Sequence, residues 1–376
     1  MEKENRRKKI LLVTRPIAPP WDEASKNFAY NLAKNTGGFD FYLLTNGIIP
    51  DLPENIHQKP IYTSNNFSYL QKLRLLKHLR KMRNDFDVLH YIFTPTKQNT
   101  FLIKKLAGSK KAKSIQTVAT LREDLFSDKE IKGLIFGDSI VTYSDCAKNK
   151  LNKLGFSNVQ RIYPGIDLNL YSPAPKDNQL LTTLNLQPGD FILTYPGEFT
   201  RLGATDDIVD MIIRHYGLLD KNKIKIIFAC RIKNKNDLRK KEEVQKKLRD
   251  KNLLGLARFP ETFTTLEKLF NTSDLVIFPV RDMKGKFDVP LAVVEAMACV
   301  KPVIISDLPI LQEFANETNS VTIKSGDTGK LFSAIIDLYQ NKEKREKIGK
   351  NAREYVEKNF DIQKIAEQYK KIYEEL

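Results

Sequence analysis

The sequence predicts an α/β protein that contains two doubly wound parallel sheets. Strand and helix signals alternate along all 376 residues, which is typical of parallel strands joined by crossover helices. The chain is long enough for two domains of ordinary size, each with its own core. The alternation restarts after residues 172–177, a stretch with two prolines that reads as a linker.

Six strands are predicted before the linker, because short apolar runs stand there between polar or glycine-containing segments. They cover residues 10–14, 41–45, 88–91, 114–118, 140–143 and 159–162. Helical patterns cover residues 26–34, 69–83, 100–107 and 147–154. After the linker, strands are predicted at residues 191–195, 224–229, 256–259, 275–278 and 303–305, with long charged helices at residues 236–251 and 342–358. We therefore predict an N-terminal domain at residues 1–171 and a C-terminal domain at residues 180–360.

The composition is that of a soluble globular protein, with 41% hydrophobic and 29% charged residues. No apolar run approaches the roughly 20 residues that a membrane-spanning helix needs. Residues 10–13 are apolar and follow a basic stretch, as in a signal peptide. This apolar stretch is too short for the core of a signal peptide and is soon followed by Arg15, so it predicts a first strand instead. Three widely spaced cysteines give neither a disulfide framework nor a metal pattern, which favours a cytoplasmic location.

The net charge of +16 is unevenly distributed. Residues 1–180 hold 29 of the 62 Lys and Arg but only 17 of the 46 Asp and Glu. This excess indicates an acidic partner for the first half: anionic lipid, nucleic acid or a polyanionic glycan. A basic but merely solvated surface explains it equally well.

Residues 69–83 form a basic amphipathic helical pattern. Leu75, Leu79 and Met82 make an apolar stripe, and six cations occupy the rest of the helix: Lys72, Arg74, Lys77, Arg80, Lys81 and Arg83. One hypothesis is that this helix docks the protein on an anionic membrane at the inner face of the cell, to meet a lipid-linked acceptor. The alternative is an ordinary packed helix with a solvated face.

The most informative segment is 271–306, which combines a strand at 275–278, a loop, a helix with Glu295 in its first turns and a strand at 303–305. In an open α/β sheet, such a loop lies outside the carboxyl end of the strand, where ligands bind. The unpaired N–H groups of the loop and the helix N-terminus suit an anion such as a diphosphate. A carboxylate that merely favours the helix dipole is the weaker interpretation.

This segment resembles the donor-nucleotide motif of the retaining glycosyltransferases of family 4 (group 1), which have the GT-B fold of two facing Rossmann-like domains. The resemblance rests on Glu295-Ala-Met-Ala298 and on further segments in the family's order. These are Asp87-Val-Leu-His90, Ile140-Val-Thr-Tyr-Ser144, Ile162-Tyr-Pro-Gly-Ile-Asp167 and Asn359-Phe-Asp361. It implies that Glu295 binds the ribose of a sugar nucleotide and that residues 361–376 form a helix that packs back on the first domain.

The resemblance also implies a donor site on the second domain. The residues expected to bind the nucleotide sugar are Gly197, Arg201, Phe259, Asp288, Val289, Leu291, Ala292 and Glu295, with Arg201, Asp288 and Glu295 assigned to catalysis. Pro290 has no N–H, so phosphate contacts fall to the backbone of Leu291 and Ala292.

Three positions depart from the family's pattern. Glu198 stands where the family has an arginine, so Arg201 is the nearest cation for the diphosphate, and Glu198 is expected to pair with it or to face the acceptor. Phe287 replaces the family's first carboxylate, which Asp288 is expected to supply one residue later. Ala119 or Thr120 stands where many members have a histidine.

The acceptor is expected to meet the first domain at Trp21, Ser25, Lys26 and Arg122. Residues 16–27 lack the glycines that the family has there; Ser25 could cap the following helix, and Lys26 could meet a phosphate as a point charge. Trp21 could form a platform for the acceptor. The four histidines are scattered, and His90 is expected to be a core residue, not a catalyst.

The function predicted from the resemblance is transfer of a sugar from a UDP- or GDP-sugar to a glycan or lipid-linked acceptor, in the synthesis of cell-surface polysaccharide or glycoconjugates. No metal, no other cofactor and no nucleic-acid partner are expected. Two alternatives stay open: a GT-B-like protein that binds nucleotide sugars without turnover, and an epimerase or phosphorylase on the same fold.

Overall fold

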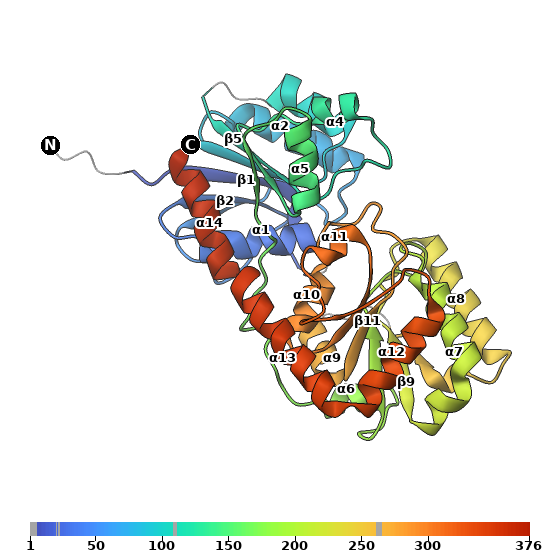
Figure 1. The fold of residues 1–376 in the computed structure, drawn as a ribbon. Coiled ribbons are helices and arrows are strands. Elements are labelled where there is room, and N and C mark those ends of the chain that lie inside the picture. Colours follow the sequence, from blue (N-terminus) through green and yellow to red (C-terminus); the bar gives the residue numbers. More distant parts are fainter. Residues whose placement is uncertain (1–5, 20, 22, 108–110, 261–264) are drawn as a thin grey trace. The chain divides into compact units, whose positions relative to one another are not determined.

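The computed structural model describes residues 6–19, 21, 23–107, 111–260 and 265–376, which form two compact units (Figure 1). The first unit contains Met1–Ile166, Phe287–Val289 and Phe360–Leu376, and the second contains Asp167–Lys286 and Pro290–Asn359. Each unit holds one parallel sheet with helices on its faces. The α/β class that the sequence predicts is therefore confirmed.

The sheet of the first unit has seven strands in the order β3-β2-β1-β4-β5-β6-β7, and all neighbours are parallel. The strands are β1 (Lys9–Ile17), β2 (Asp40–Thr45), β3 (Ile56–Lys59), β4 (Val88–Ile92), β5 (Lys113–Val118), β6 (Ser139–Thr142) and β7 (Val159–Arg161). The six predicted strands are confirmed within a few residues. Strand β3 escaped prediction because only Ile56 among its four residues is apolar and buried, as an edge strand allows.

The helices of the first unit are α1 (Ala24–Asn35), α2 (Tyr69–Met82), α3 (Lys97–Leu102), the π-helix η1 (Ile103–Ala107), α4 (Asp128–Leu134), α5 (Asp145–Lys153) and α14 (Ile362–Glu375). In α2, Leu75 and Leu79 are buried in the core beside β1 and β4, and Met82 packs against the same cluster. These side chains are therefore not available to a membrane, which corrects the stripe expected from the sequence.

The C-terminal helix α14 packs beside α1 in the first unit, as predicted (Figure 1). A buried histidine network fastens it: His90 Nδ1 lies 2.7 Å from the Tyr373 hydroxyl, and His90 Nε2 lies 2.7 Å from Thr117 Oγ1. Burial lowers the pKa of His90 to about 3, so the ring is neutral. The expectation that His90 is a satisfied core residue is confirmed.

We expect Tyr373→Phe to lower the free energy of unfolding by about 1–3 kcal/mol, because it leaves a buried ring nitrogen of His90 without its partner. Chemical denaturation of the full chain measures the loss. Tyr216→Phe, which changes an exposed tyrosine, is the matched control and should have no effect. Equal stability of both variants would show that the hydrogen bond contributes nothing.

The sheet of the second unit has six parallel strands in the order β10-β9-β8-β11-β12-β13. The strands are β8 (Phe191–Tyr195), β9 (Ile224–Phe228), β10 (Ala257–Arg258), β11 (Leu275–Phe278), β12 (Val303–Ser306) and β13 (Val321–Ile323). All but β13 were predicted. The chain moves from β8 outward to one side through β9 and β10, then to the other side through β11, so the topological switch point lies between β8 and β11.

The helices of the second unit are α6 (Asn178–Thr183), α7 (Ala204–Lys221), α8 (Lys235–Arg249), the 3-10 helix η2 (Leu254–Leu256), α9 (Leu266–Thr272), α10 (Leu291–Ala298), α11 (Pro309–Gln312), α12 (Thr328–Gln340) and α13 (Lys342–Asn359). Helix α6 begins directly after the proline-containing segment. Asp177, the last residue of that segment, caps the helix by accepting a hydrogen bond from the Leu180 N–H. Among the described residues of both units, no helix combines the length and the apolar character needed to cross a bilayer.

Candidate active site

Charged side chains gather at the carboxyl end of the second unit's sheet, on the loops that follow β8, β9 and β11. Glu198 and Arg201 follow β8, Lys233 follows β9, and Lys286 belongs to the long loop after β11. The strands β8 and β11 flank the switch point, which is where open α/β sheets bind their ligands. The topology therefore brings four charges from three loops to the expected ligand site.

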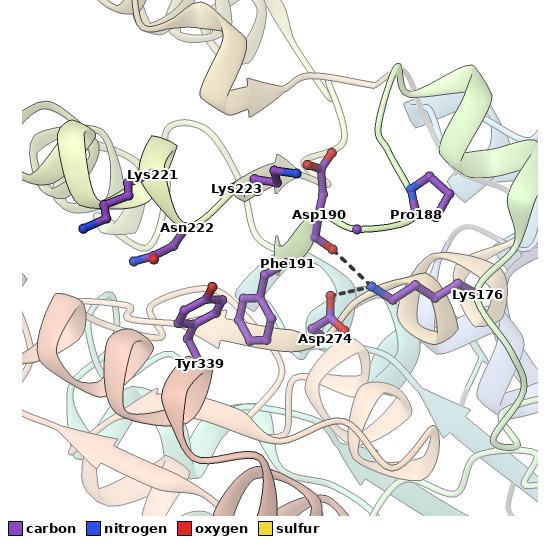
Figure 2. A pocket seen from close by; sticks show the side chains of 10 residues that line it. Lys176, Pro188, Asp190, Phe191, Lys221, Asn222, Lys223, Asp274 and Tyr339 are labelled. Carbon is purple, nitrogen blue, oxygen red and sulfur yellow. Dashed lines mark hydrogen bonds and ion pairs between the residues drawn. The ribbon is translucent and has the colours of Figure 1, made fainter.

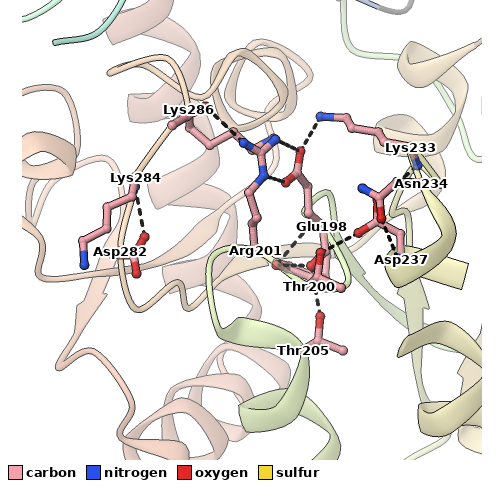
Figure 3. Close-up of polar contacts among 12 residues, drawn as sticks. Glu198, Thr200, Arg201, Thr205, Lys233, Asn234, Asp237, Asp282, Lys284 and Lys286 are labelled. Carbon is pink, nitrogen blue, oxygen red and sulfur yellow. Dashed lines mark hydrogen bonds and ion pairs between the residues drawn. The ribbon is translucent and has the colours of Figure 1, made fainter. Parts of the chain in front are cut away.

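Glu198 is the centre of this cluster (Figure 3). Its carboxylate accepts hydrogen bonds from Arg201 Nε at 2.5 Å and Nη2 at 2.9 Å, and the ammonium groups of Lys233 and Lys286 both contact its Oε1. Glu198 is only 3% exposed, so these partners offset the cost of burying its charge. The prediction that Glu198 pairs with Arg201 is confirmed.

The cluster carries an excess of positive charge. Burial alone would raise the pKa of Glu198, but Arg201, Lys286 and Lys233 outweigh it and lower the pKa to about 2, so the carboxylate is ionised. One carboxylate neutralises only one of the three cations. Burial and repulsion from Lys233 accordingly lower the pKa of Lys286 to about 8, despite its contact with Glu198. A cluster with three cations and one anion is suited to a multivalent anion.

Neighbouring polar groups fix the Glu198 loop. Thr200 Oγ1 donates to Asp237 Oδ1 at 2.6 Å, and the same buried carboxylate accepts from the Lys233 N–H at 3.1 Å, which joins the loops after β8 and β9. A Cβ atom at Gly197 would lie 1.9 Å from the ring of Tyr195, so only glycine lets the chain pass at this point.

Helix α10 presents the second part of the predicted donor site. Its first backbone hydrogen bond is donated by Val293 to the Pro290 carbonyl, so the N–H groups of Leu291 and Ala292 precede the helical bonds. Glu295 is 8% exposed, and burial raises its pKa to about 7, while a hydrogen bond from the Tyr171 side chain opposes this rise. A carboxyl group whose pKa is perturbed at a ligand-binding edge is a candidate functional group.

Asp288 and Val289 belong to the first unit by their contacts, although their chain neighbours on both sides belong to the second. The Asp288 N–H donates to the Ala119 carbonyl at 3.0 Å, and its carboxylate accepts a hydrogen bond from Ser144 Oγ. The ring of Phe287 packs edge-on against Tyr143. By these contacts the structure places Asp288 among first-unit residues.

Phe259 ends an aromatic stack in the second unit. Its ring lies 4.9 Å from that of Phe228 at an angle of 8°, and Phe199 stacks on both. Phe199 stands in the loop after β8 beside Glu198, so the stack adjoins the charged cluster. A flat, partly exposed aromatic surface of this kind suits a nucleobase.

The predicted acceptor residues occupy the first unit with defined partners. Trp21 stacks on Tyr30 with ring centres 4.5 Å apart, and Arg122 forms a two-point ion pair with Asp124 at 2.8 Å. Ser25 does not cap α1: the helix begins at Ala24 with Glu23 as its N-cap, so that expectation was wrong. Lys26 is 5% exposed, which places its stem in the core.

A separate cavity of about 420 Å³ lies at the opposite, amino end of the second unit's sheet (Figure 2). Its lining includes residues at or just before the starts of β8, β9 and β11, among them Phe191, Lys223 and Asp274. The Lys176 ammonium is held there by Asp274 at 2.6 Å and by the Asp190 carbonyl at 3.3 Å (Figure 2). Because it lies at the wrong end of the strands, this cavity is not the predicted donor site.

Sequence reasoning missed Lys233 and Lys286. Both stand in lysine-rich loops, 233–235 and 284–286, where the sequence does not distinguish a lysine that turns inward from a solvated one. Lys284, two residues before Lys286, lies apart from the cluster (Figure 3). The signal available in the sequence was Glu198 itself, because a carboxylate in place of a cation at a diphosphate site calls for cationic partners nearby.

Comparisons with known proteins find relatives of this chain in sequence and in structure. Residues 204–355, within the second unit, match the family model of glycosyl transferases group 1. The chain is 25% identical to an uncharacterized glycosyltransferase of Methanocaldococcus jannaschii, over 92% of this chain and 93% of that protein. It is 23% identical to the N-acetyl-alpha-D-glucosaminyl L-malate synthase of Bacillus anthracis, over 89% of each.

Among solved structures, the chain is similar to HepE of Anabaena in complex with UDP and glucose. The TM-score is 0.77 at 18% identity, and the match covers 99% of this chain and 100% of that one. The likeness shows that the two parallel sheets are those of the GT-B fold. The protein is thus a glycosyltransferase with the GT-B fold, whose residues 204–355 match glycosyl transferases group 1.

Proposed function

We propose that this protein transfers a sugar from a nucleotide-diphosphate sugar and that the Glu198 cluster binds the diphosphate. The observation that carries the proposal is the convergence of Arg201, Lys233 and Lys286 on one buried carboxylate at the switch point. Glu198 holds the three cations in place by ion pairs and neutralises one positive charge. The two positive charges that remain favour binding of a diphosphate. These charges stabilise the departing diphosphate during transfer, the role that oriented cations have in phosphate chemistry.

Helix α10 completes the proposed donor site. The N–H groups of Leu291 and Ala292 would bind phosphate oxygens, and the Glu295 carboxylate would accept hydrogen bonds from the ribose hydroxyls. Phe259 would stack on the base. Uridine is the favoured base because HepE, which shares the fold, was solved with UDP and with UDP-glucose.

The proposed reaction retains the configuration of the transferred sugar. The bond from the anomeric carbon to the diphosphate oxygen breaks, and the acceptor oxygen bonds to the same carbon from the same face. The proton of the acceptor hydroxyl passes to the departing phosphate oxygen, so no separate protein base is required. We propose a glycan or a lipid-linked glycan as the acceptor and cytoplasmic synthesis of a glycoconjugate as the role.

Calorimetry with UDP and GDP, together with turnover assays on their sugar derivatives, tests this proposal. Lys286→Met should weaken UDP binding on the order of 100-fold at pH 7, because it removes a cation that would make a charge-assisted hydrogen bond to the diphosphate. Lys284→Met is the matched control, since it removes the same charge from the same loop outside the cluster. Equal UDP binding by the two variants would contradict the proposed site, and tight binding with no turnover of any donor would favour a non-catalytic binding protein.

A further inference from the structure

The turn that ends the loop after β8 has an unusual backbone. Leu202 and Gly203 have positive φ angles of 75° and 69°, in the left-handed region that residues other than glycine rarely adopt. Leu202 is also buried, with 4% of its surface exposed. A bulky residue keeps such a conformation only where the surrounding contacts impose it. The turn connects Glu198 and Arg201 to the start of helix α7, so these contacts bear on the donor site.

Arg281, in the loop after β11, supplies contacts of this kind. Its backbone N–H donates to the Leu202 carbonyl at 2.7 Å. Its guanidinium forms a two-point ion pair with Asp207 in the first turn of α7: Nε lies 2.9 Å from Oδ2, and Nη2 lies 2.6 Å from Oδ1. Its stem packs directly on Gly203, where a Cβ atom would lie 2.9 Å from Arg281 Cδ. We call Leu202, Gly203, Asp207 and Arg281 the Arg281 clamp.

The acid of this ion pair is buried. Asp207 is 4% exposed, although the Arg281 side chain remains 58% exposed. A buried carboxylate requires a charged partner, because an unpaired charge in the interior costs much free energy. Loss of the Arg281 guanidinium would therefore leave the first turn of α7, and the turn before it, free to rearrange.

The start of α7 also holds Glu198. Thr205, which stands between Gly203 and Asp207, donates from its Oγ1 to the Glu198 carbonyl at 3.1 Å. Thr205 is 2% exposed, so this hydrogen bond is shielded from water. Helix α7 is thus fastened to the first part of the loop through Thr205 and to its last part through the Arg281 clamp.

Arg281 and Lys286 stand in the same loop after β11. Arg281 ties the start of that loop to the loop after β8, and Lys286 ties its later part to Glu198. Arg201 Nη1 donates to the Gly285 carbonyl at 3.3 Å, which joins the same two loops a third time. The position of Lys286 relative to Arg201 therefore depends on the connection that Arg281 makes.

We propose that Arg281 is a positioning residue of the donor site, which with Asp207 sets the two loops so that Arg201 and Lys286 meet one diphosphate. The inference rests on the proposed function, because it concerns the same cations. In this role Arg281 does not contact the ligand. It acts through the geometry of the loops, since cations that are held in advance bind a ligand more tightly than cations that must first be ordered.

Two substitutions with opposite effects on the net charge test this role. Arg281→Met removes a positive charge and Asp207→Asn removes a negative one, and both break the two-point ion pair. Both variants should bind UDP about tenfold more weakly at pH 7, because the cations must then be ordered when the ligand binds. If Arg281 acted only through its charge, Asp207→Asn would bind UDP more tightly. Arg281→Lys keeps the charge and one ion-pair contact, so it should recover much of the lost affinity.

A double substitution separates positioning from an independent contribution. Arg281→Met/Lys286→Met should lose less affinity for UDP than the two single losses multiplied together, because the clamp acts in part through Lys286. Losses that multiply in full would overturn the inference, since Arg281 would then act separately from Lys286.

The matched controls come from a second ion pair of α7. Asp210 Oδ1 lies 2.8 Å from Lys247 Nζ, and this partly exposed pair joins α7 to α8 beyond the first turn. Asp210→Asn and Lys247→Met make the same charge changes as the clamp variants and should bind UDP like the unchanged protein. Thermal unfolding of every variant shows that the chain remains folded.

The inference is overturned if Arg281→Met and Asp207→Asn bind UDP like the unchanged protein, or if they change the affinity in opposite directions. It is also overturned if the controls lose as much affinity as the clamp variants. Lys286→Met separates this failure from failure of the proposed function. If Lys286→Met loses affinity and the clamp variants do not, the donor site stands without a role for Arg281. If the unchanged protein binds neither UDP nor GDP, both proposals fall.

Discussion

Glu295→Ala should reduce kcat/KM for the sugar donor on the order of 100-fold, because charge-assisted hydrogen bonds to a ligand contribute roughly 1.5–3 kcal/mol each. The chain should remain folded. Burial raises the pKa of Glu295 to about 7, so the free protein gains little stability from its charge. Thermal unfolding of the variant, recorded beside the kinetics, separates lost folding from lost binding.

A ligand lacking one hydroxyl makes this test specific to the ribose. The unchanged protein should bind UDP more tightly than 2′-deoxy-UDP, and Glu295→Ala should bind the two equally. Glu295→Gln keeps a hydrogen-bond acceptor for Tyr171 and for the ribose, so its preference for UDP over 2′-deoxy-UDP should lie between those of the unchanged protein and Glu295→Ala. An unaltered kcat/KM, or the same preference for UDP in the Ala variant, would show that Glu295 is a structural residue.

The fold was predictable because local and global signals agree in this chain. The central strands β8 and β11 are buried at every residue and apolar except for Thr194, and their bounds match the prediction at both ends. The missed strands β3 and β13 are short edge strands with few buried side chains, so their pattern resembles a loop. Parallel order follows from the alternation of strands with helices, because parallel neighbours need crossover connections.

The site was predictable only where one residue carries the signal. Glu295 was expected from the resemblance to the family's motif and Arg201 as the cation nearest the family's arginine position, and the pairing of Glu198 with Arg201 followed from charge. Lys233 and Lys286 were missed because their role depends on how three loops fold back over the sheet. The same holds for Phe287–Val289, whose contacts belong to the first unit although the flanking residues belong to the second.

Helix α2 shows how periodicity can identify a helix and still misassign its faces. The spacing of Leu75 and Leu79 fits both a core stripe and an inserting stripe, and the burial of both residues in the first unit decides for the core. The exposed Leu70 and Leu73 lie outside that stripe, so the periodicity did not identify them as exposed apolar residues. Exposure, not periodicity, separates the two kinds of apolar residue.

The affinity for UDP should fall on the order of thirtyfold between pH 7 and pH 9.5, as Lys286 loses its proton. The pKa of Lys286 is about 8 in the free protein, because burial and the neighbouring Lys233 disfavour its charge. Well below pH 8 Lys286 is charged and the affinity for UDP is at its highest. Above pH 8 each further pH unit removes most of the remaining charged form, and the affinity falls with it. A bound diphosphate favours the charged form, so binding above pH 8 must take up a proton from solution.

Lys286→Arg isolates this effect, since a guanidinium keeps its charge throughout the range. The variant should bind UDP with little dependence on pH, apart from the ligand's own titration, which both proteins share. Calorimetry in two buffers with different ionisation enthalpies counts the protons taken up, and we expect close to one for the unchanged protein at pH 9 and none for the variant. If both proteins lose affinity in parallel, Lys286 does not contact the diphosphate. The cations that Glu198 gathers would then serve only to stabilise the loops on which they stand.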